Sequence, residues 1–352
     1  MIGTTANHLA HQSPLGGVMK GKRKAKASKW AMKFLFETEA QRSMSARSQK
    51  ASNRFLDAAL HLGSTHEPLG RLAGTPSSPH SKSPDLPALL SSVINKVCKA
   101  GQLLVTEWQR VDGPRGQGDK AVVDVEIEQL LRHQLLNLFF CDFWGEETGH
   151  TLTGDSWCWV VDPNDGTNDF LRGLKGSAIS VGLLHTHTPV LGVVYAPVTI
   201  EGVPDCIAWA EGLSNLLRNG KPVASKLPDE IWSSGSRVML SSAAVNKAEI
   251  NYELCAPSSF VAMPSIAYRL AKVAAGDGVC GVSVWPTSAH DVVAGHALLR
   301  GAGGVLLNEN GDSIRYVTQD NMQVVSRRCF GGLEAVCRTL AARDWDRIFT
   351  DN

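Results

Sequence analysis

The stretch that decides the fold of this chain is Asp162-Pro163-Asn164-Asp165-Gly166-Thr167, which directly follows the apolar run of residues 157–161. A buried strand followed by a glycine-containing turn delivers side chains to the carboxyl end of the strand, where α/β proteins bind ligands. Aspartates and turn carbonyls offer only oxygen ligands, which suit Mg²⁺, Mn²⁺ or Ca²⁺. An EF-hand is excluded, because Gly173 stands where the closing glutamate of its loop belongs. Without other motifs, such a hexapeptide is more often only a turn.

Two further acidic motifs strengthen the metal hypothesis. Glu146 and Glu147 follow a short apolar run, and Asp291 stands near the start of a helix predicted over residues 289–299. Carboxylates from several segments are what a two-cation site needs. The helix macrodipole alone also explains an aspartate at a helix start, so both explanations of Asp291 stay open.

In this order, the motifs resemble those of the inositol monophosphatase superfamily of metal-dependent, lithium-sensitive phosphomonoesterases, over residues 86–340. The family pattern is a Gly-Glu-Glu, an Asp-Pro-x-Asp-Gly-Thr after a strand, and a Trp-Asp helix start followed by Ala-Gly-Gly. Within the superfamily the chain is most similar to the 3'(2'),5'-bisphosphate nucleotidase branch. The segments that carry this likeness are residues 190–197, Ser241-Ser242 and residues 286–288.

The resemblance implies an α/β (α+β) fold, a layered α/β/α/β/α sandwich of the inositol monophosphatase / fructose-1,6-bisphosphatase type, in residues 85–345. It also implies hydrolysis of a small phosphorylated metabolite with two or three Mg²⁺ ions, in the first place adenosine 3',5'-bisphosphate to AMP. Inositol monophosphate and sugar bisphosphates stay open as substrates. A catalytically degraded homologue that only binds metal or phosphate also stays open.

The resemblance further implies a role for each matching residue. The implied metal ligands are Glu146, Asp162, Asp165, Asp291 and the main-chain carbonyl of Asn164. The implied catalytic residues are Glu146 and the water-activating pair Asp124 and Thr167. The implied substrate contacts are the amides of Gly166 and Thr167, together with Arg269 and Asp291.

Several positions depart from the family pattern. His290 replaces the usual Trp before the last aspartate, which adds a titratable group near the metals. Asn164 replaces an aliphatic residue, residues 121–123 lack the usual Thr, and Val284 stands where the inositol branch has an acidic residue. Arg269, a lone arginine on a predicted helix, is also explained as a solvated or ion-paired residue.

Composition narrows the functional class. The chain has 352 residues, of which 43% are hydrophobic, and a net charge of +1 argues against a nucleic acid polymer as partner. No apolar run approaches the length of a membrane span, so no membrane partner is expected. The eight cysteines form no Cys-x-x-Cys pair, which favours reduced thiols and a cytoplasmic location. A homodimer stays open.

Residues 1–84 are expected to be a basic N-terminal extension and a linker. The first 36 residues contain no Asp or Glu, and residues 74–87 are rich in Pro and Ser. A helix is conceivable over residues 29–62. A tail and codons wrongly included upstream of the gene both stay open as explanations of the extension, and an organelle-targeting signal is disfavoured because such peptides favour Arg over Lys.

Periodicity predicts the elements of the remaining chain. Helices are predicted at residues 90–108, 127–138, 266–275, 289–299 and 332–343. Strands are predicted at residues 157–162, 178–184, 190–196, 207–211, 238–241 and 305–307.

Overall fold

A computed structural model of the chain describes residues 83–223, 227 and 230–350. These residues lie in one compact unit that starts at His80. The helix expected over residues 29–62 and nearly all of the N-terminal extension lie outside the described residues, so the proposed domain boundary stays a prediction.

An eight-stranded sheet carries the first half of the unit, in the order β10-β9-β8-β7-β6-β5-β3-β4. Only β3 and β5 are parallel neighbours in this sheet, and every other pair is antiparallel. Its strands are β3 (Asp142–Gly145), β4 (His150–Thr151), β5 (Trp157–Asp165), β6 (Ala178–His185), β7 (Thr188–Ala196), β8 (Asp205–Ala210), β9 (Leu217–Arg218) and β10 (Lys221–Pro222). A separate two-stranded ribbon joins β1 (Gly116–Gln117) to β2 (Lys120–Ala121).

A five-stranded sheet carries the second half, in the order β12-β11-β13-β15-β14. In this sheet β11 is parallel to both of its neighbours, whereas β15 is antiparallel to both of its own. The strands are β11 (Arg237–Leu240), β12 (Ser259–Ala262), β13 (Cys280–Ser283), β14 (Val305–Asn308) and β15 (Cys329–Gly332).

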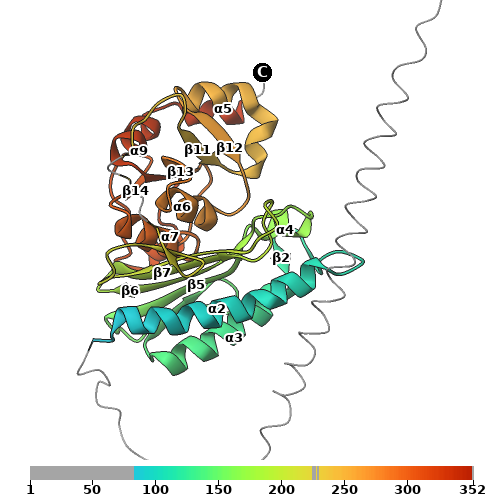
Figure 1. Ribbon diagram of the computed structural model, residues 1–352, viewed down its shortest axis with the longest axis vertical. Helices are drawn as coiled ribbons and strands as arrows, with labels where there is room; N and C mark the ends of the chain where they lie inside the picture. Colours follow the sequence, from blue (N-terminus) through green and yellow to red (C-terminus); the bar gives the residue numbers. More distant parts are fainter. Residues whose placement is uncertain (1–82, 224–226, 228–229, 351–352) are drawn as a thin grey trace, which may run out of the picture. The chain divides into compact units, whose positions relative to one another are not determined.

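Helices complete five layers (Figure 1). One face of the larger sheet is covered by α2 (Leu86–Trp108) and α3 (Val122–Leu138). Between the two sheets lie α6 (Ile266–Ala274) and α7 (Ala289–Gly301), and the far face of the smaller sheet carries α5 (Ala248–Cys255) and α9 (Glu334–Ala341). The short helices are α4 (Thr167–Leu171), α8 (Gln319–Gln323), η2 (Ser242–Lys247) and η3 (Trp345–Phe349). The expected α/β/α/β/α arrangement is therefore confirmed.

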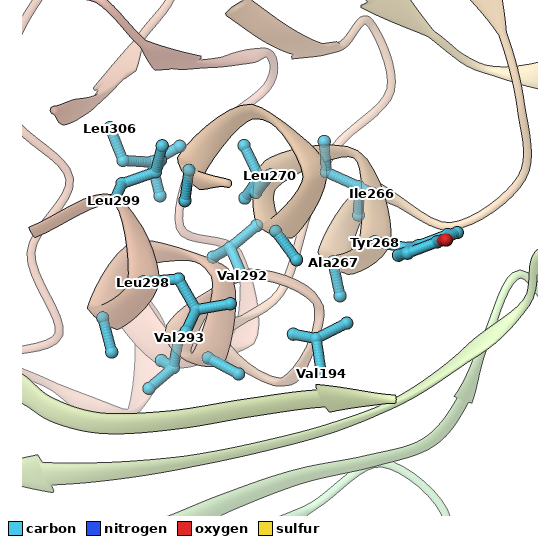
Figure 2. Close-up of a cluster of buried hydrophobic side chains, with 14 of the residues drawn as sticks. Val194, Ile266, Ala267, Tyr268, Leu270, Val292, Val293, Leu298, Leu299 and Leu306 are labelled. Atoms are coloured by element: carbon cyan, nitrogen blue, oxygen red, sulfur yellow. The ribbon is translucent and has the colours of Figure 1, made fainter. Parts of the chain in front are cut away.

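The middle layer packs closely on the larger sheet. Figure 2 shows Val292, Val293 and Leu298 of α7 among the buried side chains that fill this layer. A Cβ atom at Gly192 of β7 would lie 2.4 Å from the carbonyl oxygen of Ala294, so only glycine lets α7 approach the sheet this closely. The start of α7 is thereby held near the carboxyl end of β5.

By length and composition, the 23-residue helix α2 could cross a membrane, which corrects the expectation that no segment approaches a span. Core helices of soluble proteins pass the same test. Here Leu90, Val93, Val97 and Leu104 are buried on the side that packs against β7, β8 and α3. The apolar composition of α2 is thus explained by the core.

Candidate active site

An irregularity at the end of β5 brings its two aspartates together. Asp162 lies opposite Ser180 of β6 and Asp165 opposite Ala178, so three steps along β5 match two along β6. Side chains three residues apart in a regular strand point to opposite faces of the sheet, whereas a bulge between them lets both point to the same side. Carboxylate oxygens of Asp162, Asp165 and Asp291 all lie within 4.8 Å of one another.

Asp291 reaches this group from the first turn of α7. The amide of Ser288 donates to its Oδ2 at 2.6 Å, so the carboxylate caps the helix. Asp291 is therefore a helix cap and also a member of the acidic cluster, and its role as a metal ligand stays a prediction.

Glu146 follows β3 directly, beside the end of the parallel strand β5. Its amide donates to the carbonyl of Val161 at 3.2 Å, which ties this turn to β5. One oxygen of Glu146, one of Asp162 and one ring nitrogen of His290 lie within 4.8 Å of one another. Asp162 is thus common to two groups of potential ligands.

A buried glutamate that the sequence analysis missed holds this turn in place. Glu128 of α3 is inaccessible to solvent and accepts hydrogen bonds from the amides of Glu147 at 2.8 Å and Thr148 at 2.6 Å. The hydroxyl of Thr148 also donates to it, at 2.5 Å. The signal in the sequence is a glutamate beside Ile127 on the buried face of the helix.

Ser265, also missed, fixes Asp165 from the start of α6. Its hydroxyl donates to Oδ2 of Asp165 at 2.6 Å, and the amide of Ala267 donates to the same oxygen at 2.6 Å. Gly166, next to Asp165, has a φ of 95°, and a Cβ atom there would lie 3.1 Å from the amide nitrogen of Ser265. Glycine is required at this turn for both reasons.

The pair Asp124 and Thr167 is in contact. Asp124 is fully buried in the first turn of α3, which starts five residues earlier than expected. The hydroxyl of Thr167 lies 2.9 Å from Oδ2 of Asp124 and 2.8 Å from the carbonyl oxygen of Asn164, either of which can accept its proton. Asn164 Nδ2 donates to Oδ1 of Asp124 at 3.0 Å, so the side chain of Asn164 has a role besides its carbonyl.

Burial and mutual repulsion set the electrostatics of the cluster. Desolvation, with the nearby charge of Asp291, raises the pKa of Asp165 to about 6. Desolvation also raises the pKa of Asp291 to about 6 and, with Glu146 and Asp165 as further causes, raises that of Asp162 well above its usual range. Crowded carboxylates of this kind are stabilised as anions by a cation, so the donor set fits a divalent metal.

Arg269 is not the solvated or ion-paired residue that its sequence context also suggested. Its side chain on α6 is only 5% exposed. Its Nε donates to the carbonyl of Ser265 at 3.1 Å, and its Nη1 donates to the carbonyl of Val282. Arg269 thus links α6 to β13, and its role as a substrate contact stays a prediction.

Comparisons with known proteins agree with this geometry. The model of the inositol monophosphatase family matches residues 89–340. The chain is 28% identical, over 60% of its length and 82% of the relative's, to a fructose-1,6-bisphosphatase/inositol-1-monophosphatase of Thermotoga maritima. It is 31% identical, over 54% of its length and 72% of the relative's, to the probable inositol 1-monophosphatase ImpA of Mycobacterium tuberculosis.

Among solved structures, an inositol monophosphatase from Anabaena is similar in fold, with a TM-score of 0.56. The match covers 72% of this chain and 95% of the other, at 23% identity. The family model covers most of the chain and all the carboxylates of the acidic cluster. The chain therefore belongs to the inositol monophosphatase family, whose members are metal-dependent phosphatases that hydrolyse phosphomonoesters.

Proposed function

We propose that the chain hydrolyses a small phosphorylated metabolite with two or three Mg²⁺ ions. The implied ligands are Glu146, Asp162, Asp165, Asp291 and the carbonyl of Asn164. The observation that carries the proposal is the approach of the Asp162, Asp165 and Asp291 oxygens to within 4.8 Å. Bound Mg²⁺ would stabilise negative charge on the phosphate oxygens and lower the pKa of the attacking water.

The residues of the chain position the water and the phosphate. When Thr167 donates its proton to Asp124, its hydroxyl oxygen is free to accept a hydrogen bond from the water. Glu146 lies close to Asp162 in the second group of potential ligands. The amides of Gly166 and Thr167 open α4 and are the proposed donors to the phosphate.

For the substrate we propose adenosine 3',5'-bisphosphate, acted on in a reducing compartment such as the cytoplasm. The sequence likeness to the nucleotidase branch, in residues 190–197, Ser241-Ser242 and residues 286–288, supports this choice. Inositol 1-phosphate is the second candidate, because both relatives described above carry inositol monophosphatase in their names.

A phosphate-release assay of the full chain tests the proposal. The substrates are adenosine 3',5'-bisphosphate, inositol 1-phosphate and fructose 1,6-bisphosphate, each with Mg²⁺ and with EDTA. Asp162→Asn serves as the inactive variant and Asp112→Asn, at an exposed turn after α2, as the matched control. We expect phosphate release from adenosine 3',5'-bisphosphate. This release should require Mg²⁺ and Asp162 but not Asp112. Release from none of the three compounds would contradict the proposal.

A further inference from the structure

His290 is the one side chain other than a carboxylate that the described residues contribute to the acidic groups. A ring nitrogen of His290 completes the group with Glu146 and Asp162, whereas the group of Asp162, Asp165 and Asp291 contains oxygen alone. Asp162 belongs to both groups. The cluster therefore has two halves of different chemistry, joined by one shared carboxylate.

Within the described part of the chain, no other contact accounts for the imidazole of His290. Its Nδ1 is buried and has no hydrogen-bond partner among the described residues. Its Nε2 lies 3.9 Å from Oδ1 of Asp291, which is too long for a hydrogen bond. Buried polar atoms in folded proteins are normally satisfied, so an orphaned ring nitrogen beside carboxylates needs an explanation.

His296, on the same helix, shows the contrasting case. Its Nδ1 lies 3.0 Å from the hydroxyl of Tyr316, and the two rings are in contact. A histidine held by a protein partner needs no ligand. His296 therefore provides a matched control for His290.

We propose that the two halves bind different ions. The half formed by Glu146, Asp162 and His290 binds a transition-metal ion through one nitrogen and two carboxylates, and Mn²⁺ serves as the probe for it. The half formed by Asp162, Asp165 and Asp291 binds Mg²⁺. Imidazole is a common ligand of transition metals, whereas Mg²⁺ prefers oxygen ligands and retains water. This inference rests on the proposed metal-dependent function and replaces one of its Mg²⁺ ions with a transition-metal ion.

The test measures the metal directly, with Mn²⁺ as the probe. The full chain is loaded with one equivalent of Mn²⁺ in a large excess of Mg²⁺, and electron spin echo envelope modulation is recorded. The wild type should show nitrogen coupling from an imidazole, and ¹⁵N-histidine labelling should change that coupling without any substitution. His290→Gln and His290→Phe should remove it, whereas His296→Gln should retain it. In the same Mg²⁺ excess, the Kd for Mn²⁺ should rise at least about tenfold in both His290 variants.

Each outcome bears on the inference. It is overturned if the wild type releases Mn²⁺ to excess Mg²⁺, if its spectrum contains no nitrogen coupling, or if the coupling survives in His290→Gln. An assay of phosphate release with Mg²⁺ as the only metal distinguishes failure of the mixed-metal site from failure of the proposed function. If release persists while nitrogen coupling is absent, only the mixed-metal site is refuted. If no divalent ion supports release, the proposed function itself fails.

Discussion

The contact between Thr167 and Asp124 predicts a specific kinetic result. The Thr167 hydroxyl lies 2.9 Å from Oδ2 of an aspartate that is inaccessible to solvent. Thr167→Val keeps the volume of the side chain but removes this donor. Among the described residues, the amide of Ala121, at 3.3 Å, is then the one donor left to that carboxylate oxygen. The carboxylate can no longer hold a hydroxyl in place to orient the water.

The size of the effect follows from this geometry. Loss of a hydrogen bond to a charged group costs about 1.5–3 kcal/mol, which corresponds to roughly 10- to 150-fold in rate. Loss of general-base assistance costs ~10²–10⁴-fold. We therefore expect Thr167→Val and Asp124→Ala each to lower kcat by ~10²–10⁴-fold. Mg²⁺ affinity should change little, since neither side chain is a proposed ligand. The double variant should be no worse than the poorer single variant, because the two residues act as a unit.

The assay is phosphate release at saturating Mg²⁺, with Mg²⁺ affinity measured by calorimetry. Thr199→Val is the matched control, because Thr199 is also buried and its hydroxyl donates to the carbonyl of Val203 at 2.7 Å. It reports the general cost of deleting a buried threonine hydroxyl. Thr167→Ser should recover most of the activity. Multiplicative losses in the double variant, or wild-type turnover in Thr167→Val, would refute a water-activating pair.

Three further predictions concern the metal ligands, pH and the N-terminus. Asp162→Asn or Asp291→Asn should abolish hydrolysis. Either variant should leave the metal-free protein at least as stable as the wild type, because the repulsion between the carboxylates is relieved. Turnover near that of the wild type at saturating Mg²⁺ would refute the ligand assignment. The pKa of Asp165 is about 6 in the folded chain, against an ordinary value of 3.8. Between these two pH values the folded state binds more protons than the unfolded state, so the free energy of unfolding of the metal-free protein falls as pH rises. Asp165 alone lowers the free energy of unfolding by up to about 3 kcal/mol over this pH range. Urea titrations at several pH values should show that Asp165→Asn lessens this loss, while the part due to Asp291 remains, and that added Mg²⁺ removes it. Parallel pH curves for the wild type and Asp165→Asn would count against this. Deletion of residues 1–80 should leave hydrolysis unchanged, since their composition cannot support a core. A truncated protein that is folded but inactive would show that these residues are needed for hydrolysis.

Strands with long apolar runs could be predicted, whereas short ones could not. The runs that became β5, β6 and β7 were placed within a few residues, because their burial on both faces leaves a continuous apolar signal. In contrast, β15 reads Cys-Phe-Gly-Gly, and its glycines suggest a loop. The structure shows that a Cβ atom at Gly331 would lie 2.4 Å from Leu270, so the glycine is there to admit α6. Such a strand is defined by packing between segments far apart in the sequence.

The residues of the site also divide into those that could be predicted from the sequence and those that could not. Asp162, Asp165 and Asp291 could be named because each follows a recognisable strand end or helix start. Glu128 and Ser265 could not, since their importance depends on hydrogen bonds to residues 19 and 100 positions away. The strand β3, which Glu146 directly follows, was not predicted either. Local patterns thus identify clustered carboxylates but not the residues that hold them.

The bulge in β5 explains why the hexapeptide has its particular residues. Bringing Asp162 and Asp165 to one side requires a break in the ladder with β6, and Pro163 has no amide hydrogen to leave unpaired there. The amide of Asn164 donates to Oδ1 of Asp162 at 2.8 Å, and its side chain donates to Asp124. Gly166 then takes the left-handed turn that starts α4 with Thr167. Each residue of the stretch therefore either supplies a carboxylate or shapes the backbone that aims one. Most substitutions here should consequently disturb the acidic cluster before they disturb the core.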